Sequence, residues 1–300
     1  MESLKTILYF SIFKYPLKLE EIFSYYPVKD QQKIEIELRH LIEEKIVLKV
    51  GDFYLSGCDT ACIEKRRKGN EMAVKALVKA LERGHFISKF PFVEAVGVSG
   101  SLSKGYYDST SDIDFFVITK PGRLWLARTF LMLYKKVFLG NSRKYFCINY
   151  FMSSANLELE EKNRYTATEV KTLIPIAGLI VFEKFYAKNR WISNIFGPFN
   201  PELKNVAEIK KPKLTTLLEL LLDNRFGNVA DDAFEKITLR FWKMKFSYMN
   251  RDDFKIALKT TKDISKHHPL NFQKNVIQSL NEKYEELSKQ HNIVLQKEYV

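Results

Sequence analysis

Two short apolar runs, residues 92–100 and 111–120, enclose the most restrictive feature of this sequence. The first run ends in a Gly-Ser pair, and the second opens with Ser-Asp-Ile-Asp before it becomes continuously apolar. Apolar runs of this length, bounded by glycine and polar residues, are typical of buried strands. A buried strand that opens with Asp112 and Asp114 must leave their carboxylates at an open edge, because an unpaired charge is costly to bury.

The spacing of the two acidic residues predicts a metal site. On a strand, residues one apart point to the same face, so the side chains of Asp112 and Asp114 would lie together. Two carboxylates held side by side repel each other unless a cation lies between them. Mg²⁺ prefers oxygen ligands and binds through one or two carboxylates together with substrate phosphates. We therefore expect Mg²⁺ or Mn²⁺ at a phosphate-handling site.

The Gly-Ser pair and the loop after it carry groups suited to a polyphosphate. Gly100 lets the backbone come close to a phosphate, and the Ser101 hydroxyl and nearby N–H groups can donate hydrogen bonds to it. Gly105 permits a tight turn, and Lys104 can neutralise phosphate charge. Asp-x-Asp alone is a weak signal because aspartate is common in turns. The whole combination, with Ser111 directly before the acidic pair, favours a nucleotide site.

The segment 122–140 is predicted to form a long helix after the second strand, and its first turns carry Arg123 and Arg128. Both guanidinium groups are candidates for contact with nucleotide phosphates. Trp125, which lies between them, is more typical of a helix core. A third strand is predicted over residues 144–153.

The stretch GSLSKGYYDSTSDIDFFVI resembles the signature of the polymerase-beta-like nucleotidyltransferase superfamily. The close resemblance covers about 20 residues, and the order of strands and helix resembles the superfamily over residues 92–152. The chain also resembles bacterial proteins of uncharacterised role that join a winged-helix-like start to such a domain. The phrases GRLWLAR, CINYF, YTATE and SKHHP carry that second resemblance.

The resemblance implies a reaction and assigns roles within it. A nucleoside monophosphate would pass from an NTP to a hydroxyl of an acceptor that the sequence does not identify, with release of pyrophosphate. Asp112 and Asp114 would ligate metal, and Gly100 and Ser101 would hold the triphosphate. Catalysis would rest on positioning and on charge neutralisation around the reacting phosphorus.

One position departs from the superfamily pattern. A third carboxylate usually lies on a later strand, and the matching strand FCINYF holds Asn149, which we assign to nucleotide binding. An amide oxygen can bind a metal, but an amide is a poor base. Glu158, Glu160 and Glu169 are candidate replacements, although Glu169 is also placed to complete a capping box with Thr166. The alternative function is therefore a catalytically impaired NTP-binding regulatory protein.

The 300 residues suit two or three domains, and the fold class is predicted to be mixed α/β. Helices over 4–13, after Pro16 and over 30–47, followed by a hairpin at Gly51-Asp52, resemble a winged helix-turn-helix. We expect a winged-helix-like domain over 1–60, a nucleotidyltransferase domain with a leading connector helix over 61–190, and a helical domain over 191–300. The helical domain is predicted from segments 213–225, 229–249, 252–265 and 270–297.

The net charge of +12 favours polyanionic partners, although a solvated lysine-rich surface explains it equally well. DNA binding by the third helix is not expected, because that helix is acidic on balance. The segment 241–251 interleaves aromatic and basic residues, which suits either single-stranded nucleic acid or helix packing. His267 and His268 precede Pro269, either as the end of a helix or as groups that contact phosphate.

No apolar run approaches the roughly 20 residues needed to cross a bilayer, so no membrane partner is expected. The three cysteines and the lack of a secretory signal predict a cytoplasmic protein with reduced thiols. Cys58 and Cys62 have no second Cys/His pair nearby, so a zinc site there is not expected.

Overall fold

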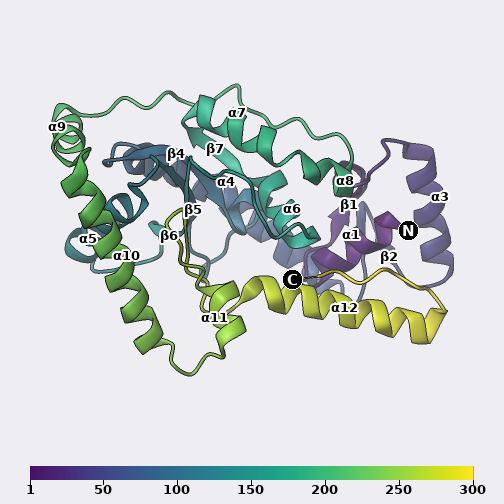
Figure 1. The fold of residues 1–300 in the computed structure, drawn as a ribbon. Helices are drawn as coiled ribbons and strands as arrows, with labels where there is room; N and C mark the ends of the chain where they lie inside the picture. Colours follow the sequence, from purple (N-terminus) through teal and green to yellow (C-terminus); the bar gives the residue numbers. More distant parts are fainter. Residues whose placement is uncertain (300) are drawn as a thin grey trace.

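The computed structural model describes residues 1–299, which surround a five-stranded sheet with the order β7-β4-β5-β6-β8 (Figure 1). The strands are β4 (Val93–Ser99), β5 (Asp114–Thr119), β6 (Cys147–Ser153), β7 (Ile174–Ala177) and β8 (Ile264–Lys266). Strands β5 and β6 are parallel, and the other neighbouring pairs are antiparallel. The mixed α/β class is confirmed, as are the strands predicted over 92–100, 111–120 and 144–153.

Helices cover both faces of this sheet, which explains why β5 is apolar along most of its length. Phe115 and Val117 face a core built with α4 (Ala61–Ile87) and α5 (Leu124–Phe138). Phe116 faces the opposite core, which contains residues of α6 (Arg164–Thr172) and α7 (Leu179–Lys188). Alternate side chains of a strand enter opposite faces, so a strand covered on both sides must be apolar throughout. The two ends are the exceptions: Asp114 at the first position, and Thr119 at the last, whose buried hydroxyl donates to the Met152 carbonyl.

The N-terminal segment contains three helices and a small three-stranded sheet. Its elements are α1 (Glu2–Ser11), β1 (Leu17–Lys18), α2 (Leu19–Ser24), α3 (Gln31–Glu43), β2 (Leu48–Val50) and β3 (Phe53–Leu55), with the sheet order β1-β3-β2. The predicted helices and hairpin are thus present, and the winged-helix-like character of the segment stays a prediction. Buried side chains of α1 and α3 belong to the same hydrophobic cluster as α6 and α7.

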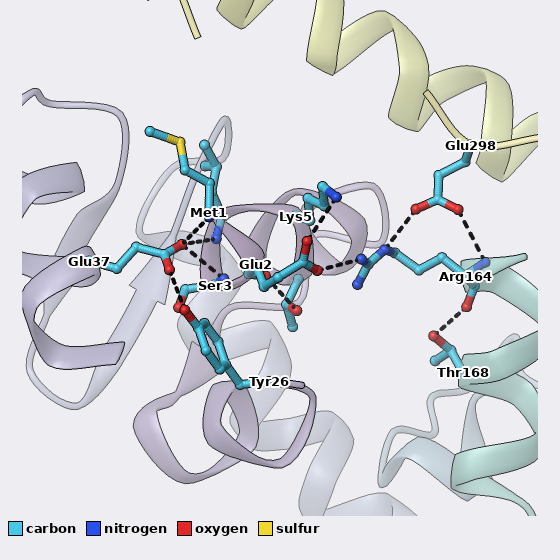
Figure 2. A network of polar contacts seen from close by, with 11 residues as sticks. Met1, Glu2, Ser3, Lys5, Tyr26, Glu37, Arg164, Thr168 and Glu298 are labelled. Atoms are coloured by element: carbon cyan, nitrogen blue, oxygen red, sulfur yellow. Dashed lines mark hydrogen bonds and ion pairs between the residues drawn. The ribbon is translucent and has the colours of Figure 1, made fainter. Parts of the chain in front are cut away.

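A polar network joins the two ends of the chain to α6 (Figure 2). Arg164, which begins α6, is 4% exposed, and its guanidinium lies 2.8 Å from Glu2 Oε2 and 2.9 Å from Glu298 Oε1. Nearby, Glu37 of α3 accepts hydrogen bonds from the Ser3 amide and the Tyr26 hydroxyl, both at 3.0 Å. These contacts hold α1, α3 and the C-terminal tail around α6.

The C-terminal part is not wholly helical, which corrects the prediction for residues 252–265. Its helices are α8 (Ser193–Phe196), α9 (Lys213–Leu222), α10 (Arg225–Lys245), α11 (Arg251–Ala257) and α12 (Phe272–His291). Strand β8 follows α11 and pairs with β6 at the edge of the central sheet. The segment before β8 contains two adjacent threonines, which favour strand over helix. Hydrogen bonds between β8 and β6 further stabilise the strand.

A second correction concerns the helix start predicted from the capping box of Thr166 and Glu169. The Asn163 side chain accepts a hydrogen bond from the Thr166 amide, so Thr166 lies inside the helix. The helix α6 ends at Thr172, and β7 follows at the other edge of the sheet. Pro175 accounts for the break, because proline interrupts a helix but is tolerated in an edge strand.

The predicted domain boundaries at residues 60/61 and 190/191 stay predictions. Two connections cross them, namely the hydrophobic cluster shared by α1 and α7, and the pairing of β8 with β6. Across residues 1–299, every helix is too short or too polar to traverse a bilayer.

Candidate nucleotide and metal site

The site lies at the edge of the sheet where three strand ends meet. Asp114, the first residue of β5, pairs with Ser99 at the end of β4 and with Cys147 at the start of β6. Because β4 runs antiparallel to β5, the Gly-Ser turn that follows β4 arrives at the same edge as Asp114. The topology therefore brings together the two halves of the sequence motif.

Gly100 lies directly against the side chain of Asp114. Its φ is +70°, and a Cβ built on it would lie 2.4 Å from Asp114 Oδ2. Both the left-handed backbone and the lack of space require glycine here. Ser101 follows at the start of the short 3₁₀ turn η1 (Leu102–Lys104), and Gly105 ends that turn with a φ of +74°. The backbone of this turn thus packs against a carboxylate, and the predicted role of Gly100 and Ser101 in holding a phosphate stays a prediction.

Asp112 lies just before β5 rather than on it, so the two acidic residues do not share one regular strand. Its charge nevertheless acts on Asp114. Burial is the main cause that raises the pKa of Asp114 to about 6, and the carboxylates of Asp112 and Glu169 raise it further. A hydrogen bond from Cys147 and the charge of Lys104 lower that pKa in part. Negative charge is therefore concentrated at the strand end.

Asn149 holds Asp114 in place. Its amide nitrogen donates a hydrogen bond of 2.8 Å to Asp114 Oδ1. The register of β5 and β6 shifts between Phe115 and Phe116, and Asn149 is the extra residue of β6 at this bulge. A bulge changes the direction of a side chain that regular alternation along the strand would point away from the site. Asn149 thus reaches the site, and it presents its nitrogen, not its oxygen, to the acidic residue.

Glu169 is the acidic replacement candidate that reaches this edge. Its Oε1 lies 2.9 Å from Lys104 Nζ, and the same ammonium donates to the Gly100 carbonyl at 3.0 Å. The predicted role of Glu169 as a helix cap is wrong, because Asn163 provides the cap. Glu158 and Glu160 instead pair with lysines outside the site. Those partners are Lys162 for Glu158 and Lys259 for Glu160, both at 2.6 Å.

Two other predicted residues point away from the strand end. Ser111 belongs to a turn in which its amide and hydroxyl both donate to Asp108 Oδ1, at 3.0 and 2.9 Å. Arg123 lies beyond the opposite end of β5, where it contacts Asp223 at 3.3 Å and Asn228 at 2.5 Å. The structure therefore does not bring Arg123 to the nucleotide site; this arginine connects α10 to the start of α5.

The paired histidines follow a strand, which corrects the interpretation of a helix end. The His267 amide donates a hydrogen bond of 2.8 Å to the Asn149 carbonyl, so the end of β8 adjoins the site. Burial lowers the pKa of His267 to about 4, and the charges of Arg128, Arg143 and other nearby cations contribute to the decrease. His267 is therefore neutral at pH 7.

The donor set fits a divalent cation bound together with substrate. Asp112 and Asp114 offer oxygens only, which is the ligand type that Mg²⁺ and Mn²⁺ prefer. In residues 1–299 no group of three or more His, Cys, Asp or Glu residues is gathered for a metal. Two carboxylates suffice where substrate phosphates and water complete the shell. Gly100 packs so closely against Asp114 that no side chain fits between them. A ligand would therefore reach Asp114 from the side that Gly100 does not cover.

Sequence reasoning missed Cys147 and Lys135. Cys147 faces Asp114, and burial together with that carboxylate raises the pKa of its thiol. Lys135 of α5 is 7% exposed, and burial is the main cause that lowers its pKa, while Cys147 and Asp112 act in the opposite direction. Aligning the starts of the two parallel strands would have found Cys147. Lys135 could not have been found in this way, because the sequence around it does not show that the end of α5 lies near this edge of the sheet.

Comparison with known proteins agrees with this geometry. Residues 83–213 match the family described as nucleotidyltransferase domain, and that range contains β4, η1, β5, β6 and Glu169. Members of the family transfer nucleoside monophosphates and generally use a divalent metal ion. No curated protein and no solved structure matches the chain significantly. Residues 83–213 therefore match a nucleotidyltransferase domain, as the resemblance to the polymerase-beta-like superfamily predicted, and this match supports a transferase enzyme.

Proposed function

We propose that the chain transfers a nucleoside monophosphate from a magnesium-bound NTP to a hydroxyl of an acceptor, at the edge formed by Asp112 and Asp114. The contact between Gly100 and Asp114 carries the proposal, because a Cβ there would lie 2.4 Å from Oδ2. A glycine turn seated on a carboxylate allows a phosphate and a metal ligand to occupy adjacent positions.

Each residue of the site has a chemical task in this proposal. Asp112 and Asp114 would hold the metal, which supplies charge neutralisation at the phosphates. The backbone from Gly100 to Lys104 and the Ser101 hydroxyl would donate to the triphosphate. Asn149 keeps Asp114 oriented through its hydrogen bond of 2.8 Å. The Lys104 ammonium, now 2.9 Å from Glu169, would turn to the phosphates and release that carboxylate.

The reaction itself needs one proton acceptor. The acceptor oxygen forms a bond to the α-phosphorus, and the bond from that phosphorus to the bridging oxygen breaks, so pyrophosphate leaves. Glu169, once free of Lys104, would take the proton from the attacking hydroxyl and pass it to water. A positioned carboxylate base of this kind contributes about 10²–10⁴-fold to the rate.

An NTP-binding regulatory role is the second candidate. Asn149 offers nitrogen rather than a carboxylate at the third position, and no group of three acidic ligands is present in residues 1–299. In this case Asp112 and Asp114 would still bind Mg²⁺ and NTP, and no transfer would follow. The two functions therefore share one site and differ in whether Glu169 acts as a base.

The test uses each NTP labelled at the α-phosphorus, with Mg²⁺ and size-fractionated cell extract as the source of acceptor. We expect label to appear on one fraction, and Asp114→Asn to lower the rate about 10³-fold or more, because charge stabilisation is the largest catalytic contribution. Asp108→Asn is the matched control, since Asp108 forms a turn with Ser111 in the same loop. It should keep most of the activity.

Three outcomes separate the candidates. Glu169→Gln that binds NTP normally but transfers about 10²-fold more slowly supports the base role. NTP binding that needs Asp114, with no label transferred in any fraction, supports the regulatory role instead. Absence of NTP binding to the wild-type protein with Mg²⁺ or Mn²⁺ overturns both.

A further inference from the structure

Cationic side chains gather near the end of β8, where the ring of His267 lies 4.9 Å from the Trp242 ring and 5.7 Å from the Phe246 ring. The Arg128 guanidinium lies 5.0 Å from the centre of the Trp242 ring, and the Lys245 ammonium lies 5.3 Å from that of Phe246. We call Arg128 and Lys135 of α5, Arg143 after it, and Lys245 at the end of α10 the basic cluster. All four lie close enough to His267 for their charges to lower its pKa, although burial is the larger cause. Elements far apart in the sequence thus place positive charge at one position.

Direct ion pairs do not neutralise the basic cluster, and the carboxylate whose charge acts on one of its members is Asp112, beside Lys135. Within residues 1–299, none of its four members forms an ion pair with a carboxylate, unlike Lys104 or Arg164. Arg128 instead lies over aromatic rings, 5.6 Å from the centre of Trp125 and 5.0 Å from that of Trp242. Burial lowers the pKa of Arg128 to about 10, which leaves the guanidinium charged at pH 7. Cations held near one another without carboxylate ion pairs are suited to an external anion.

The basic cluster adjoins the proposed catalytic edge. His267 donates its amide hydrogen to Asn149, whose side chain donates to Asp114. Lys135 is close enough to Cys147 and Asp112 for their charges to act on its pKa. The Gly-Ser turn reaches the same edge from β4, on the other side of β5. The NTP phosphates and a second anion would therefore approach Asp114 from opposite sides.

Exposed aromatic rings extend this surface along the last turns of α10 and the turn that follows it. Phe241 and Tyr248 are 51% and 77% exposed. The Lys245 ammonium lies 5.9 Å from the centre of the Phe241 ring, and the ring of Tyr248 lies 6.2 Å from that of Phe246. Single strands of nucleic acid are bound by cations along their backbone and by aromatic rings that stack on bases. A small phosphorylated acceptor would need one phosphate contact and no exposed rings.

We infer that the acceptor is the end of a single-stranded nucleic acid, with its backbone phosphates on the basic cluster and its bases on the exposed rings of Phe241 and Tyr248. This inference rests on the proposed function, because it assigns the acceptor of that same site. The strand would run from α10 past His267 to the edge at Asp112 and Asp114, where its terminal hydroxyl meets the NTP.

The experiment measures fluorescence anisotropy of a labelled single-stranded RNA or DNA of about 12 nucleotides, a length within the usual site size. The full chain is titrated over a range of potassium chloride concentrations. We expect Lys245→Gln to weaken binding several-fold and to reduce the slope of log affinity against log salt by about 1. Tyr248→Ala should weaken binding without changing the slope, because stacking releases no counterions. Arg128→Gln should act like Lys245→Gln.

Lys33→Gln is the matched control, because Lys33 is an exposed residue of α3 and its replacement also removes one positive charge. It should leave both affinity and slope unchanged. Equal weakening by Lys33→Gln and Lys245→Gln overturns the inference, since binding would then follow net charge or the N-terminal segment. Competition by ribose 5-phosphate at the same concentration as the oligonucleotide also overturns it and indicates a small acceptor.

Binding of magnesium-bound ATP to the same preparations keeps the two proposals distinguishable. Suppose that ATP binding requires Asp114 but oligonucleotide binding is unchanged in the variants of the basic cluster. This result rejects the inference and leaves the proposed function intact. If the wild-type protein does not bind magnesium-bound ATP, the proposed function is rejected, whether or not the oligonucleotide binds. Lys245 is exposed, so its variant remains informative even if Arg128→Gln fails to fold.

Discussion

Arg128 lies in α5 and Arg164 is the first residue of α6, and both helices cover the central sheet. The surroundings of the two arginines differ. Arg164 is 4% exposed and lies within 2.9 Å of two carboxylates, Glu2 and Glu298 (Figure 2). Arg128 lies over the rings of Trp125 and Trp242, and it has no carboxylate partner in residues 1–299. The first arginine has its charge neutralised within the fold, and the second does not.

This difference separates a structural group from a binding group. A buried cation with carboxylate partners becomes costly when a partner is lost, so it ties segments together. A cation without such partners already bears its desolvation cost in the folded state, and an anionic ligand can relieve that cost. The network at Arg164 thus connects the chain ends, whereas the basic cluster at Arg128 has no such partners and adjoins the proposed catalytic edge.

The largest expected effect comes from removing the paired arginine. Arg164→Met would leave Glu298 without this counter-charge and Glu2 with Lys5 alone, and it should lower the free energy of unfolding by about 3 kcal/mol. Urea denaturation followed by tryptophan fluorescence measures this change. Arg128→Met is the control, because it removes an unpaired charge and keeps an apolar stem between the tryptophans. It should change the free energy by less than about 1 kcal/mol. A larger cost for Arg128→Met than for Arg164→Met would contradict the comparison.

The sequence predicted the local parts of the fold well. The strands β4, β5 and β6 have apolar runs bounded by glycine or polar residues, and all three were predicted from those runs. The strands at the two edges were missed, because β7 and β8 are short and depend on pairing with distant partners. Propensity over four residues is a weak signal beside such tertiary contacts.

The same limit applies to the site. Asp112, Asp114 and Gly100 could be predicted because they lie within one continuous motif. Arg123 was misplaced, since its position at the start of a helix does not reveal that Asn228 lies within hydrogen-bond distance. Glu169 and the basic cluster depend on which helix ends return to one sheet edge. Spacing along the chain carries no information about that juxtaposition.

An intermediate effect is expected from anions. A single-stranded oligonucleotide at about 100 times its dissociation constant should stabilise the wild-type protein by about 2.7 kcal/mol, through binding to the folded state only. The thermal midpoint measures this stabilisation. Arg128→Met should reduce the shift, because it removes a phosphate contact, whereas a Glu2→Gln variant should keep the whole shift although its starting midpoint is lower. The comparison fails if both variants lose the shift equally.

The smallest effect concerns the pH dependence of the network. Burial alone would raise the pKa of Glu2, but Arg164 and Lys5 outweigh it and leave the pKa below the ordinary 4.5. A carboxylate with a lowered pKa stabilises the folded state fully above its unfolded-state pKa, and this contribution is lost as the pH falls through the folded-state value. The wild type should therefore exceed Glu2→Gln in stability by about 1–2 kcal/mol at neutral pH.

That advantage should decline from about pH 4.5 downward, where Glu2 becomes protonated first in the unfolded chain and then in the folded one. Thermal midpoints of both proteins across this range measure it. Glu285→Gln is the matched control, because Glu285 pairs with Lys297 at 2.6 Å on the open surface, where solvent screens the pair. Its midpoint should follow that of the wild type at every pH. A constant gap between wild type and Glu2→Gln down to strongly acidic pH would show that Glu2 acts through packing, and that charge pairing does not distinguish Arg164 from Arg128.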